Sequence, residues 1–505
     1  MSNQSFAPAS DTSLQRYEHL YIDGEWVKPL DGELIESIDP ATGKPWAVAP
    51  MGGPQDIDRA VAAARQAFNG PWRRMPGHER AALLRRFADL FSAAIPELAV
   101  IESRDNGNLV REHRASLTAQ VQWYQWFASL ADKAQGTTIP IDDSVHAFTT
   151  RVPIGVVGAI IPWNAPLLAT CLKIGAALAA GCAVVVKPAE QTPVSALELA
   201  RLMHEAGIPP GVFNVVPGFG RTAGAHLVKH PDVNKISFTG ASQTAKHMVR
   251  DGAENLKRFT FELGGKAPHI IFADADLDNA INAATASAWR LTGQSCALGS
   301  RVLVERPIYD RVVDAFRTRA KSVRVGLPSV DTNHMGPQAH EEQLRKTLSY
   351  IEFGKQDGAE LITGGSRVLT PALAPGYFVE PTVFAGVTNQ MRIARDEIFG
   401  PVASLIPFDG EDEAIAIAND TPYGLTAGLW TRDVGRAHRV SNRIEAGMVW
   451  VNTYSFLRWS TPYGGFKVSG WGRENGIHAL DPYLETRTTV ISTSGQFPNL
   501  YTWTE

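Results

Sequence analysis

The sequence predicts an α/β protein with two doubly wound parallel-sheet domains and a small additional β-sheet. Between residues 156 and 263, short apolar runs alternate with helical stretches, and a second alternating region extends from 269 to about 451. Such wholly apolar runs are typical of parallel strands that are covered on both faces. Residues 134–151 and 483–491 fit neither region and are rich in Thr, Val and Ile, so they favour an outlying sheet.

The first region contains five predicted strands separated by helical stretches. Thr192 can cap the helix between the second and third strands, Pro193 suits its first position, and Gly207 can end it. Repeated alternation of strand and helix predicts a doubly wound sheet. The predicted strands are residues 156–161, 183–186, 213–216, 235–239 and 259–263.

The second region shows the same alternation. Helical stretches at residues 277–289 and 411–419 separate its apolar runs. We therefore expect a second α/β domain. Its predicted strands include residues 302–304, 402–406, 426–430 and 448–451.

Composition limits the class of protein. The 505-residue chain has 48 Lys and Arg against 52 Asp and Glu, a formal net charge of −4, which argues against nucleic acid as a partner. Its three cysteines are too few for a disulfide framework, and this usage is typical of a reducing compartment, so we expect a cytoplasmic protein. We expect no metal site.

One uncharged stretch, residues 152–172, is about long enough to cross a bilayer. Pro153, Pro162 and Pro166 interrupt it, and proline breaks helices, so we expect a buried strand, a turn and a buried helix there. Residues 1–15 are polar and have no apolar core, unlike a signal or transit peptide. The sequence therefore predicts no membrane partner.

Cys296 lies in the segment GQSCALGSR, residues 293–301, between glycines that let the backbone approach a ligand closely. A thiolate in such a loop can attack a carbonyl group. A cysteine can equally be a small buried apolar residue. The Ala-rich surroundings of Cys171 and Cys182 favour that interpretation for both.

Two polar side chains follow predicted strands of the first region. Glu262 lies in FELGGK, and Asn164 lies in PWNAP. Ligands of open α/β sheets collect beyond the carboxyl ends of the strands, so Glu262 is a candidate general base and Asn164 a candidate donor to an oxyanion. Each has a structural alternative, namely a surface glutamate beside a turn and an asparagine that caps the following helix.

Two glycine-rich turns, residues 218–224 and 238–242, each follow a strand and open a helix. Their backbone N–H groups could hold a pyrophosphate, although the first turn misses the Rossmann glycine spacing by one residue. Lys187 and Glu190, which follow another strand, could bind ribose hydroxyls. The alternative for the two glycine-rich segments is an ordinary tight turn between strand and helix. The alternative for Lys187 and Glu190 is a solvated turn.

Together these motifs resemble those of the aldehyde dehydrogenase superfamily, over about residues 20–490. PWNAP, FELGGK and GQSCALGSR are similar to the family's asparagine, glutamate and cysteine motifs. Further similar segments are EIFGPV at 397–402, NDTPYGL at 419–425 and TPYGGFKVSGWGRENG at 461–476. The resemblance implies an NAD(P)-dependent enzyme that oxidises an aldehyde to the acid. The reaction would pass through a thioester on the cysteine. Because coenzyme A-acylating relatives typically lack the glutamate, its presence favours hydrolysis of that thioester.

The resemblance also implies a role for each matched residue. Cys296 would be the nucleophile, Asn164 and the Cys296 N–H would form the oxyanion hole, and Glu262 would activate water. Lys187 and Glu190 would bind the adenosine ribose of NAD, with NADP as a possible substitute. Further residues expected at the cofactor are Ile161, Pro162, Trp163, Gly220, Gly224, Phe238, Gly240, Ala241, Leu263, Gly264, Glu397 and Phe399.

The family's architecture divides the chain into three parts. Residues 1–133 and 152–264 would form the NAD-binding domain, and residues 265–475 the catalytic domain. Residues 134–151 and 476–505 would form the small sheet that joins subunits. We therefore expect a homodimer or homotetramer.

Most residues aligned with the aldehyde entrance are large and apolar or aromatic, which suits a bulky aromatic or apolar aldehyde. Ala165 stands where relatives often have an aromatic ring, so it would leave space beside Cys296. Either Arg290 or Arg458 could instead bind the carboxylate of an acidic semialdehyde. Ala241 replaces a serine that contacts the pyrophosphate in many relatives. The entrance residues are Trp123, Leu168, Arg290, Phe456, Trp459 and Tyr463.

A non-catalytic protein on the same fold is a further alternative, because fold does not determine function. Loss of Cys296 or Asn164 would favour it, and both residues are present. An unrelated α/β dehydrogenase is disfavoured by the imperfect glycine spacing.

Overall fold

The first sheet of the computed structural model, which describes residues 14–495 and 501, has eight strands in the order β20-β12-β11-β8-β9-β10-β2-β3. Strands β12 to β10 in this order pair in parallel, and the direction of winding reverses between β8 and β11. The predicted strands of the first region are confirmed to within one residue at either end. Their bounds are Val156–Ile160 (β8), Ala183–Lys187 (β9), Phe213–Val215 (β10), Lys235–Thr239 (β11) and Arg258–Glu262 (β12).

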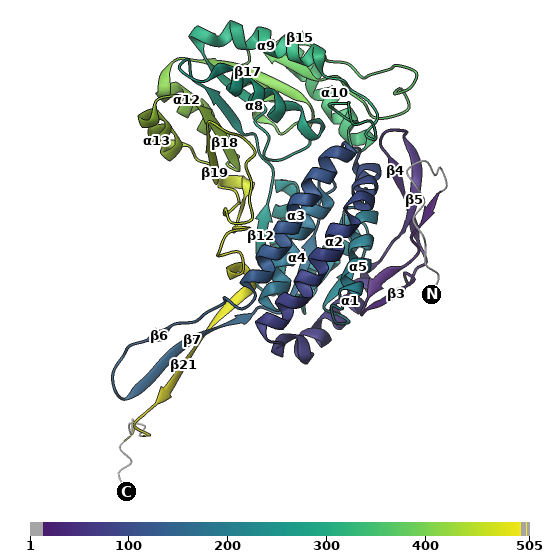
Figure 1. Ribbon diagram of the computed structural model, residues 1–505, viewed down its shortest axis with the longest axis vertical. Helices are drawn as coiled ribbons and strands as arrows, with labels where there is room; N and C mark the ends of the chain where they lie inside the picture. The colour runs from purple at the N-terminus through teal and green to yellow at the C-terminus, as the bar shows by residue number, and fades with distance from the viewer. Residues whose placement is uncertain (1–13, 496–500, 502–505) are drawn as a thin grey trace.

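Two helical layers cover this sheet (Figure 1). In β9, Val184 and Val186 pack on one face and Ala183 and Val185 on the other, which explains why the strand is apolar as far as Lys187 at its end. One layer consists of Gly77–Asn106 (α2), Val110–Leu130 (α3), Pro166–Ala180 (α4) and Val194–Glu205 (α5). The other consists of Pro54–Ala67 (α1), Ala225–Lys229 (α6) and Ser242–Asp251 (α7).

Helix α5 begins without its predicted cap. Its N-cap residue is Pro193, and the Thr192 hydroxyl has no hydrogen-bond partner among the described residues. The buried Asp105 carboxylate instead accepts hydrogen bonds from the N–H groups of Val194 and Ser195, at 3.1 and 3.4 Å. A side chain from α2 therefore replaces the local cap.

The second sheet has seven strands in the order β15-β16-β17-β14-β13-β18-β19, all parallel to their neighbours except β15. Helices cover both of its faces, which confirms the second predicted α/β region. The strands are Pro268–Ile271 (β13), Arg301–Glu305 (β14), Glu360–Thr363 (β15), Thr382–Ala385 (β16), Val402–Phe408 (β17), Thr426–Trp430 (β18) and Met448–Val451 (β19). The helices are Leu277–Trp289 (α8), Tyr309–Ser322 (α9), Glu341–Gln356 (α10), Arg392–Arg395 (α11), Gly410–Asn419 (α12) and Val434–Arg443 (α13).

The residues before α1 add short strands that the sequence analysis did not predict. Leu20–Ile22 (β2) and Glu25–Val27 (β3) form a hairpin that extends the first sheet beyond β10. A separate three-stranded sheet contains Gln15–Arg16 (β1), Leu34–Asp39 (β4) and Lys44–Pro50 (β5).

The predicted outlying sheet is present as an arm that projects from the body (Figure 1). Val145–Pro153 (β7) and Leu484–Ser492 (β21) pair antiparallel, and Thr138–Ile139 (β6) lies on the other side of β7. Before it enters the arm, the chain returns to the first sheet, because Gly470–Trp471 (β20) pairs with β12. The role of this arm in joining subunits stays a prediction.

The uncharged stretch at residues 152–172 contains β8, a turn and the buried start of α4, as predicted. Within residues 14–495, no helix is both long and apolar enough to cross a membrane. Most of the predicted polar tail, residues 1–13, lies outside the described residues.

Candidate active site

The predicted catalytic residues meet between the two sheets. Asn164 follows β8 and Glu262 ends β12, so both lie at the carboxyl end of the first sheet. Cys296 lies before β14 and Glu397 before β17, at the amino end of the second sheet. Asn164 Nδ2 donates a hydrogen bond to the Gln294 carbonyl at 3.0 Å. The carboxyl end of one sheet therefore faces the amino end of the other.

The loop that carries Cys296 is shaped by close backbone contacts. Gly293 has φ +72°, and a Cβ there would lie 2.1 Å from the carbonyl carbon of Gly400. A Cβ on Gly265 would lie 2.3 Å from the Cys296 carbonyl oxygen. Glycines in the cysteine and glutamate motifs thus let the two loops touch.

Of the three cysteines, Cys296 alone is partly exposed, whereas Cys171 and Cys182 are fully buried. The interpretation of those two as core residues is confirmed. Burial and the charge of Glu397 raise the pKa of the Cys296 thiol to about 12, and a hydrogen bond with Tyr463 opposes this. The sulfur lies 3.8 Å from Tyr463 Oη.

Asn164 does not cap the helix that follows it, so that alternative is wrong. The N-cap residue of α4 is Ala165, and the Glu102 carboxylate of α2, not the Asn164 side chain, accepts a hydrogen bond from the Leu167 N–H in its first turn at 2.9 Å. The Asn164 amide points instead at the loop of Cys296. Because an amide carries two N–H groups and Gln294 accepts one, the other can donate to an oxyanion beside the sulfur.

The loop of Asn164 is held by side chains that the sequence analysis missed. Asn106 and Asn108 each donate from Nδ2 to the Asn164 carbonyl, at 3.2 Å. His113 lies 2.9 Å from Asn106 Oδ1 and 3.0 Å from the Glu102 carboxylate. The polar run at residues 104–108 was the only local signal for this support. It was not sufficient, because the exposed end of a surface helix would have the same composition.

Glu262 is only 4% exposed, so the surface-glutamate alternative is wrong. Burial and the negative charge of Glu474 raise the pKa of its carboxyl well above the usual value, and Lys173 opposes them. Neither carboxyl oxygen has a hydrogen-bond partner within the described part of the chain. A buried carboxyl with a raised pKa is suited to act as a general base near neutral pH.

The turns predicted to bind a dinucleotide lie beyond the carboxyl ends of β8 to β12. Lys187 Nζ donates to the Gly218 carbonyl at 2.7 Å and lies 3.5 Å from Glu190, whose side chain is 30% exposed. Gly224 packs against Lys187, and a Cβ on Gly220 would meet open space. This edge therefore presents an accessible carboxylate beside glycine turns that a ligand can approach.

Two further contacts join the strand ends of the first sheet to the segment before β17 of the second. The ring of Trp163 meets that of Phe399 edge-on at 5.3 Å. Glu397 Oε1 accepts a hydrogen bond from the Gly265 N–H at 2.9 Å, and Gly264 lies against the same carboxylate. Residues expected at the cofactor from the first sheet and from the segment before β17 are thus brought together beside the cysteine loop.

Not every residue expected at the cofactor offers its side chain. Ile161, Phe238 and Leu263 have their side chains in the cores on either face of the first sheet. Only their backbone atoms can therefore face a ligand. Ala241 is the N-cap residue of α7, and Gly240 lies against the Phe238 ring.

No group of three or more His, Cys, Asp or Glu among the described residues could hold a metal ion.

The chain matches the family model described as "Aldehyde dehydrogenase family" over residues 26–489. It belongs to the aldehyde dehydrogenase family. Membership confirms the predicted superfamily and the predicted enzyme class, an oxidoreductase that acts on an aldehyde group.

Relatives match this aldehyde dehydrogenase over almost its whole length. An aldehyde dehydrogenase from Enchytraeus buchholzi is 45% identical over 96% of this chain and 98% of its own. The rat protein named aldehyde dehydrogenase, cytosolic 1 is 46% identical over 97% of each chain.

Solved structures confirm the fold class. The NAD+ complex of an aldehyde dehydrogenase from Bacillus cereus has a TM-score of 0.94 at 44% identity, covering 97% of this chain and 100% of that one. Betaine aldehyde dehydrogenase from Staphylococcus aureus in complex with NAD+ has a TM-score of 0.95 at 36% identity, covering 96% and 97%.

Four predicted entrance residues of this aldehyde dehydrogenase lie on one side of the site. Trp123 Nε1 donates to Asn475 Oδ1 at 2.9 Å, and its ring meets Trp459 edge-on at 5.7 Å. Leu168 and Trp459 pack against the core between the first sheet and helices α2 to α5, which also contains Trp123. Tyr463 contacts the Cys296 sulfur.

Arg290 and Phe456 do not join this aromatic group. Arg290 is exposed and lies 4.0 Å from the Glu112 carboxylate. Phe456 is half exposed, and the Arg458 guanidinium lies over its ring at 4.3 Å. Both arginines considered for an acidic substrate therefore have partners of their own.

Proposed function

We propose that this chain oxidises an aldehyde to its carboxylic acid through a thioester on Cys296, with NAD as hydride acceptor and water as acyl acceptor. One observation carries the proposal. The Asn164 amide reaches the Cys296 loop from the end of one strand. The buried Glu262 carboxyl lies at the end of another and has no hydrogen-bond partner among the described residues. A nucleophile, an oxyanion donor and a base are thereby supplied together.

The chain's own residues divide the reaction into two easier steps. The Cys296 thiolate adds to the aldehyde carbon, while Asn164 Nδ2 and the Cys296 N–H donate to the oxygen that becomes charged. When bound, NAD would supply the hydride acceptor that lets this oxygen become a carbonyl again, as the adduct becomes the thioester. Glu262 then takes a proton from water as its oxygen attacks the thioester, and the acid departs while the sulfur leaves as thiolate.

The first sheet offers a fitting place for a dinucleotide. Its switch in winding between β8 and β11 is the position where such sheets bind ligands. The accessible Glu190 carboxylate suits a ribose with two free hydroxyls, and its charge would repel the 2′-phosphate of NADP. The NAD+ complexes of the two relatives from Bacillus cereus and Staphylococcus aureus support the choice of NAD.

We infer a bulky aromatic or apolar aldehyde as substrate. The partly buried Leu168 and Trp459 support it, with the Trp459 ring set against the buried Trp123, since such side chains line small-molecule pockets. The small Ala165 beside Asn164 would leave room next to the nucleophile. An acidic semialdehyde is less well supported, because Arg290 lies beside the Glu112 carboxylate.

The projecting arm supports a homo-oligomer, a dimer or a tetramer. In the described sheet, β21 is an edge strand with one side unpaired. Val490 and Ile491 on it are 59% and 50% exposed, and Ile141, which follows β6 on the other side of β7, is 60% exposed. Exposed apolar side chains on an edge strand favour association. The name of the rat relative supports a cytosolic location for this chain as well.

The experiment is to follow NADH formation with benzaldehyde, a branched aldehyde, succinate semialdehyde and acetaldehyde, with and without coenzyme A. We expect the free acid as product in both cases and the largest kcat/KM for benzaldehyde or the branched aldehyde. Acyl-coenzyme A as product would contradict hydrolysis by Glu262. A preference for acetaldehyde or the semialdehyde would contradict the apolar pocket, and failure with every aldehyde would contradict the activity itself.

A further inference from the structure

The Tyr463 hydroxyl is a polar group beside the sulfur that the reaction above does not use. Its oxygen lies 3.8 Å from Cys296 Sγ, within hydrogen-bond range for sulfur. Tyr463 is 7% exposed, and its hydroxyl makes no other hydrogen bond with the described residues. A buried hydroxyl whose partner is the sulfur of the nucleophile calls for a role in the chemistry.

The backbone, not the sulfur, holds Tyr463 in this place. Tyr463 and Glu474 exchange two backbone hydrogen bonds, each of 2.7 Å. Glu474 in turn accepts from Lys173 of α4 at 2.8 Å, and both of these side chains are buried. Tyr463 is therefore tied through Glu474 to helix α4 of the first sheet, while the Cys296 loop leads into β14 of the second sheet.

The charges around the sulfur make such a donor useful. Burial and the carboxylates of Glu397 and Glu262 all raise the pKa of the Cys296 thiol, whereas the Tyr463 hydroxyl lowers it. Burial, reinforced by the charges of Cys296, Glu262 and Glu474, holds the pKa of the Tyr463 phenol well above its usual range. Tyr463 consequently keeps its proton and remains a donor.

We propose that Tyr463 is a further catalytic residue, whose hydroxyl donates a hydrogen bond to the Cys296 thiolate and stabilises it before attack. The inference rests on the proposed function in one respect, that Cys296 is the nucleophile. As the sulfur bonds to the aldehyde carbon, the negative charge moves to the aldehyde oxygen. The hydrogen bond from Tyr463 then weakens, while the one from Asn164 strengthens.

The expected effect is modest and has a definite sign. A hydrogen bond to a charged group shifts the thiol pKa by about one unit, which changes the thiolate fraction about tenfold. A more stable thiolate is also a weaker nucleophile, by about threefold for this shift. The net gain below the thiol pKa is therefore about threefold in rate.

The test is the rate at which iodoacetamide alkylates Cys296 in Tyr463→Phe, measured by peptide mass from neutral to moderately alkaline pH. We expect alkylation about threefold slower than in the wild type throughout this range. An unchanged or faster rate would overturn the proposal. Because the assay needs neither aldehyde nor NAD, it gives an answer even if the chain fails to oxidise aldehydes.

Tyr454→Phe is the matched control. Tyr454 is a partly buried phenol, and it donates to the Ala297 carbonyl at 3.0 Å, on the same loop but not to the sulfur. We expect its alkylation rate to equal that of the wild type. Equal slowing in both variants would mean that a loosened loop, and not the hydrogen bond, changes the thiol.

A graded replacement separates donor strength from shape. Fluorotyrosines at position 463 keep the ring and the hydroxyl but make the phenol more acidic, so the hydrogen bond to a thiolate strengthens. We expect the alkylation rate to increase with the acidity of the phenol. A flat series would contradict the proposal.

Discussion

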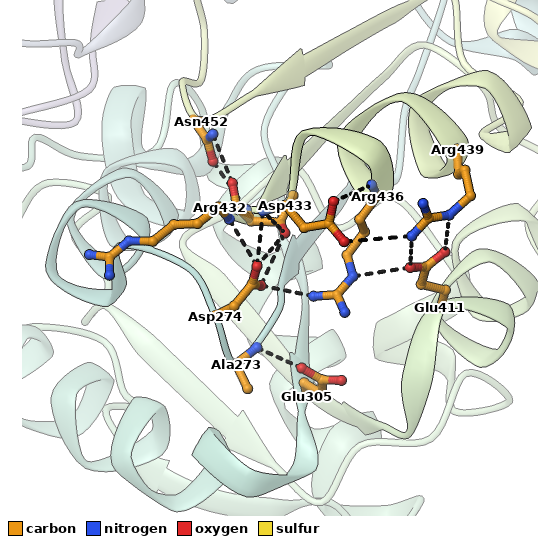
Figure 2. A network of polar contacts seen from close by, with 10 residues as sticks. Ala273, Asp274, Glu305, Glu411, Arg432, Asp433, Arg436, Arg439 and Asn452 are labelled. Atoms are coloured by element: carbon orange, nitrogen blue, oxygen red, sulfur yellow. Dashed lines mark hydrogen bonds and ion pairs between the residues drawn. The ribbon is translucent and has the colours of Figure 1, made fainter.

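The two parallel sheets follow the same folding rule but differ in what lies at their carboxyl ends. The first sheet ends in glycine turns, an asparagine and a buried glutamate without a protein partner in the described chain. The second sheet ends in a network of partnered charges (Figure 2). There, Asp274 after β13 accepts hydrogen bonds from the Thr431 hydroxyl and the N–H groups of Arg432 and Asp433 after β18.

This network extends over neighbouring strands and helices of the second sheet (Figure 2). Arg436 of α13 lies 2.9 Å from Asp274 and 3.1 Å from Glu411 of α12. Asn452 after β19 exchanges two hydrogen bonds with the backbone of Thr431, at 3.1 and 2.9 Å. The donors and acceptors at these strand ends are therefore already used within the protein.

The comparison refines the rule that ligands collect beyond the carboxyl ends of parallel strands. The rule describes the first sheet, whose strand ends leave polar groups available. The second sheet contributes through its amino end, where Cys296 and Glu397 precede β14 and β17. In the proposed reaction one fold is thus used twice, once to bind the cofactor and once to hold the nucleophile.

The largest expected effect separates the nucleophile from the rest of the site. Cys296→Ala should reduce aldehyde oxidation on the order of 10⁴-fold or more, because no other group can form the thioester. NAD binding, followed by quenching of tryptophan fluorescence, should survive, since the cofactor turns belong to the first sheet.

Cys171→Ala is the control for this variant, because that cysteine is fully buried outside the site. It should retain turnover. Oxidation near the wild-type rate in Cys296→Ala would place the nucleophile elsewhere.

The next variant tests whether the first sheet supplies the oxyanion donor. Asn164→Asp keeps the size of the side chain but cannot donate from Nδ2, so kcat should fall by about 10²–10³-fold. Asn164→Ala should give a similar loss. A change confined to KM in steady-state kinetics would mean that Asn164 binds the substrate without stabilising the transition state.

The third prediction concerns the base at the end of β12. Because burial and Glu474 raise the pKa of Glu262, the carboxyl stays protonated at pH values where an ordinary glutamate is ionised. Thioester hydrolysis should therefore rise by about tenfold per pH unit until Glu262 ionises. Rapid-quench measurement of deacylation checks this, and a rate independent of pH would contradict it.

The smallest effect tests the second sheet. Asp274→Asn should lower the free energy of unfolding by about 1–2 kcal/mol, because its partly exposed carboxylate accepts several hydrogen bonds. Turnover should be unchanged. Asp412→Asn, which breaks an exposed ion pair with Arg443, should change stability by less than about 0.5 kcal/mol.

Acid should remove the contribution of Asp274. Partial burial raises its pKa, but hydrogen bonds from Thr431, Arg432 and Asp433 outweigh this and hold the pKa below the usual value of 3.8. A carboxyl whose pKa is lowered by folding stabilises the fold fully at pH values above its unfolded-state pKa, and this contribution is lost as pH falls through the lowered pKa of the folded state. Thermal unfolding of wild type and variant should therefore converge in strong acid. If Asp274→Asn lost turnover while its stability stayed unchanged, the carboxyl end of the second sheet would have to bind a ligand.

The parts of this structure that depend on local pattern could be predicted from the sequence. Strands β8 and β9 are buried on both faces, and each is an apolar run apart from Lys187 at the end of β9. The short strands could not be predicted, because β20 is two residues long and is defined by its pairing with the distant β12. The cap of α5 by Asp105 likewise depends on a residue far away in the chain.

The site divides in the same way. The motifs around Cys296, Glu262 and Asn164 are local, and they indicated which residues to examine. The supports of these residues are not local, since Asn106 and Asn108 hold Asn164 from α2 and from the loop after it. Tyr463 was expected only as an entrance residue, because nothing in its own segment places its hydroxyl beside the sulfur.

Intact-mass measurement of Glu262→Gln during turnover tests the central claim most directly. If the first sheet provides the base and the second the nucleophile, loss of the base should leave a covalent acyl group on Cys296. We predict a burst of about one NADH per chain and a mass increase equal to the acyl group on the peptide that contains Cys296. Full turnover without any adduct on Cys296 would contradict the account.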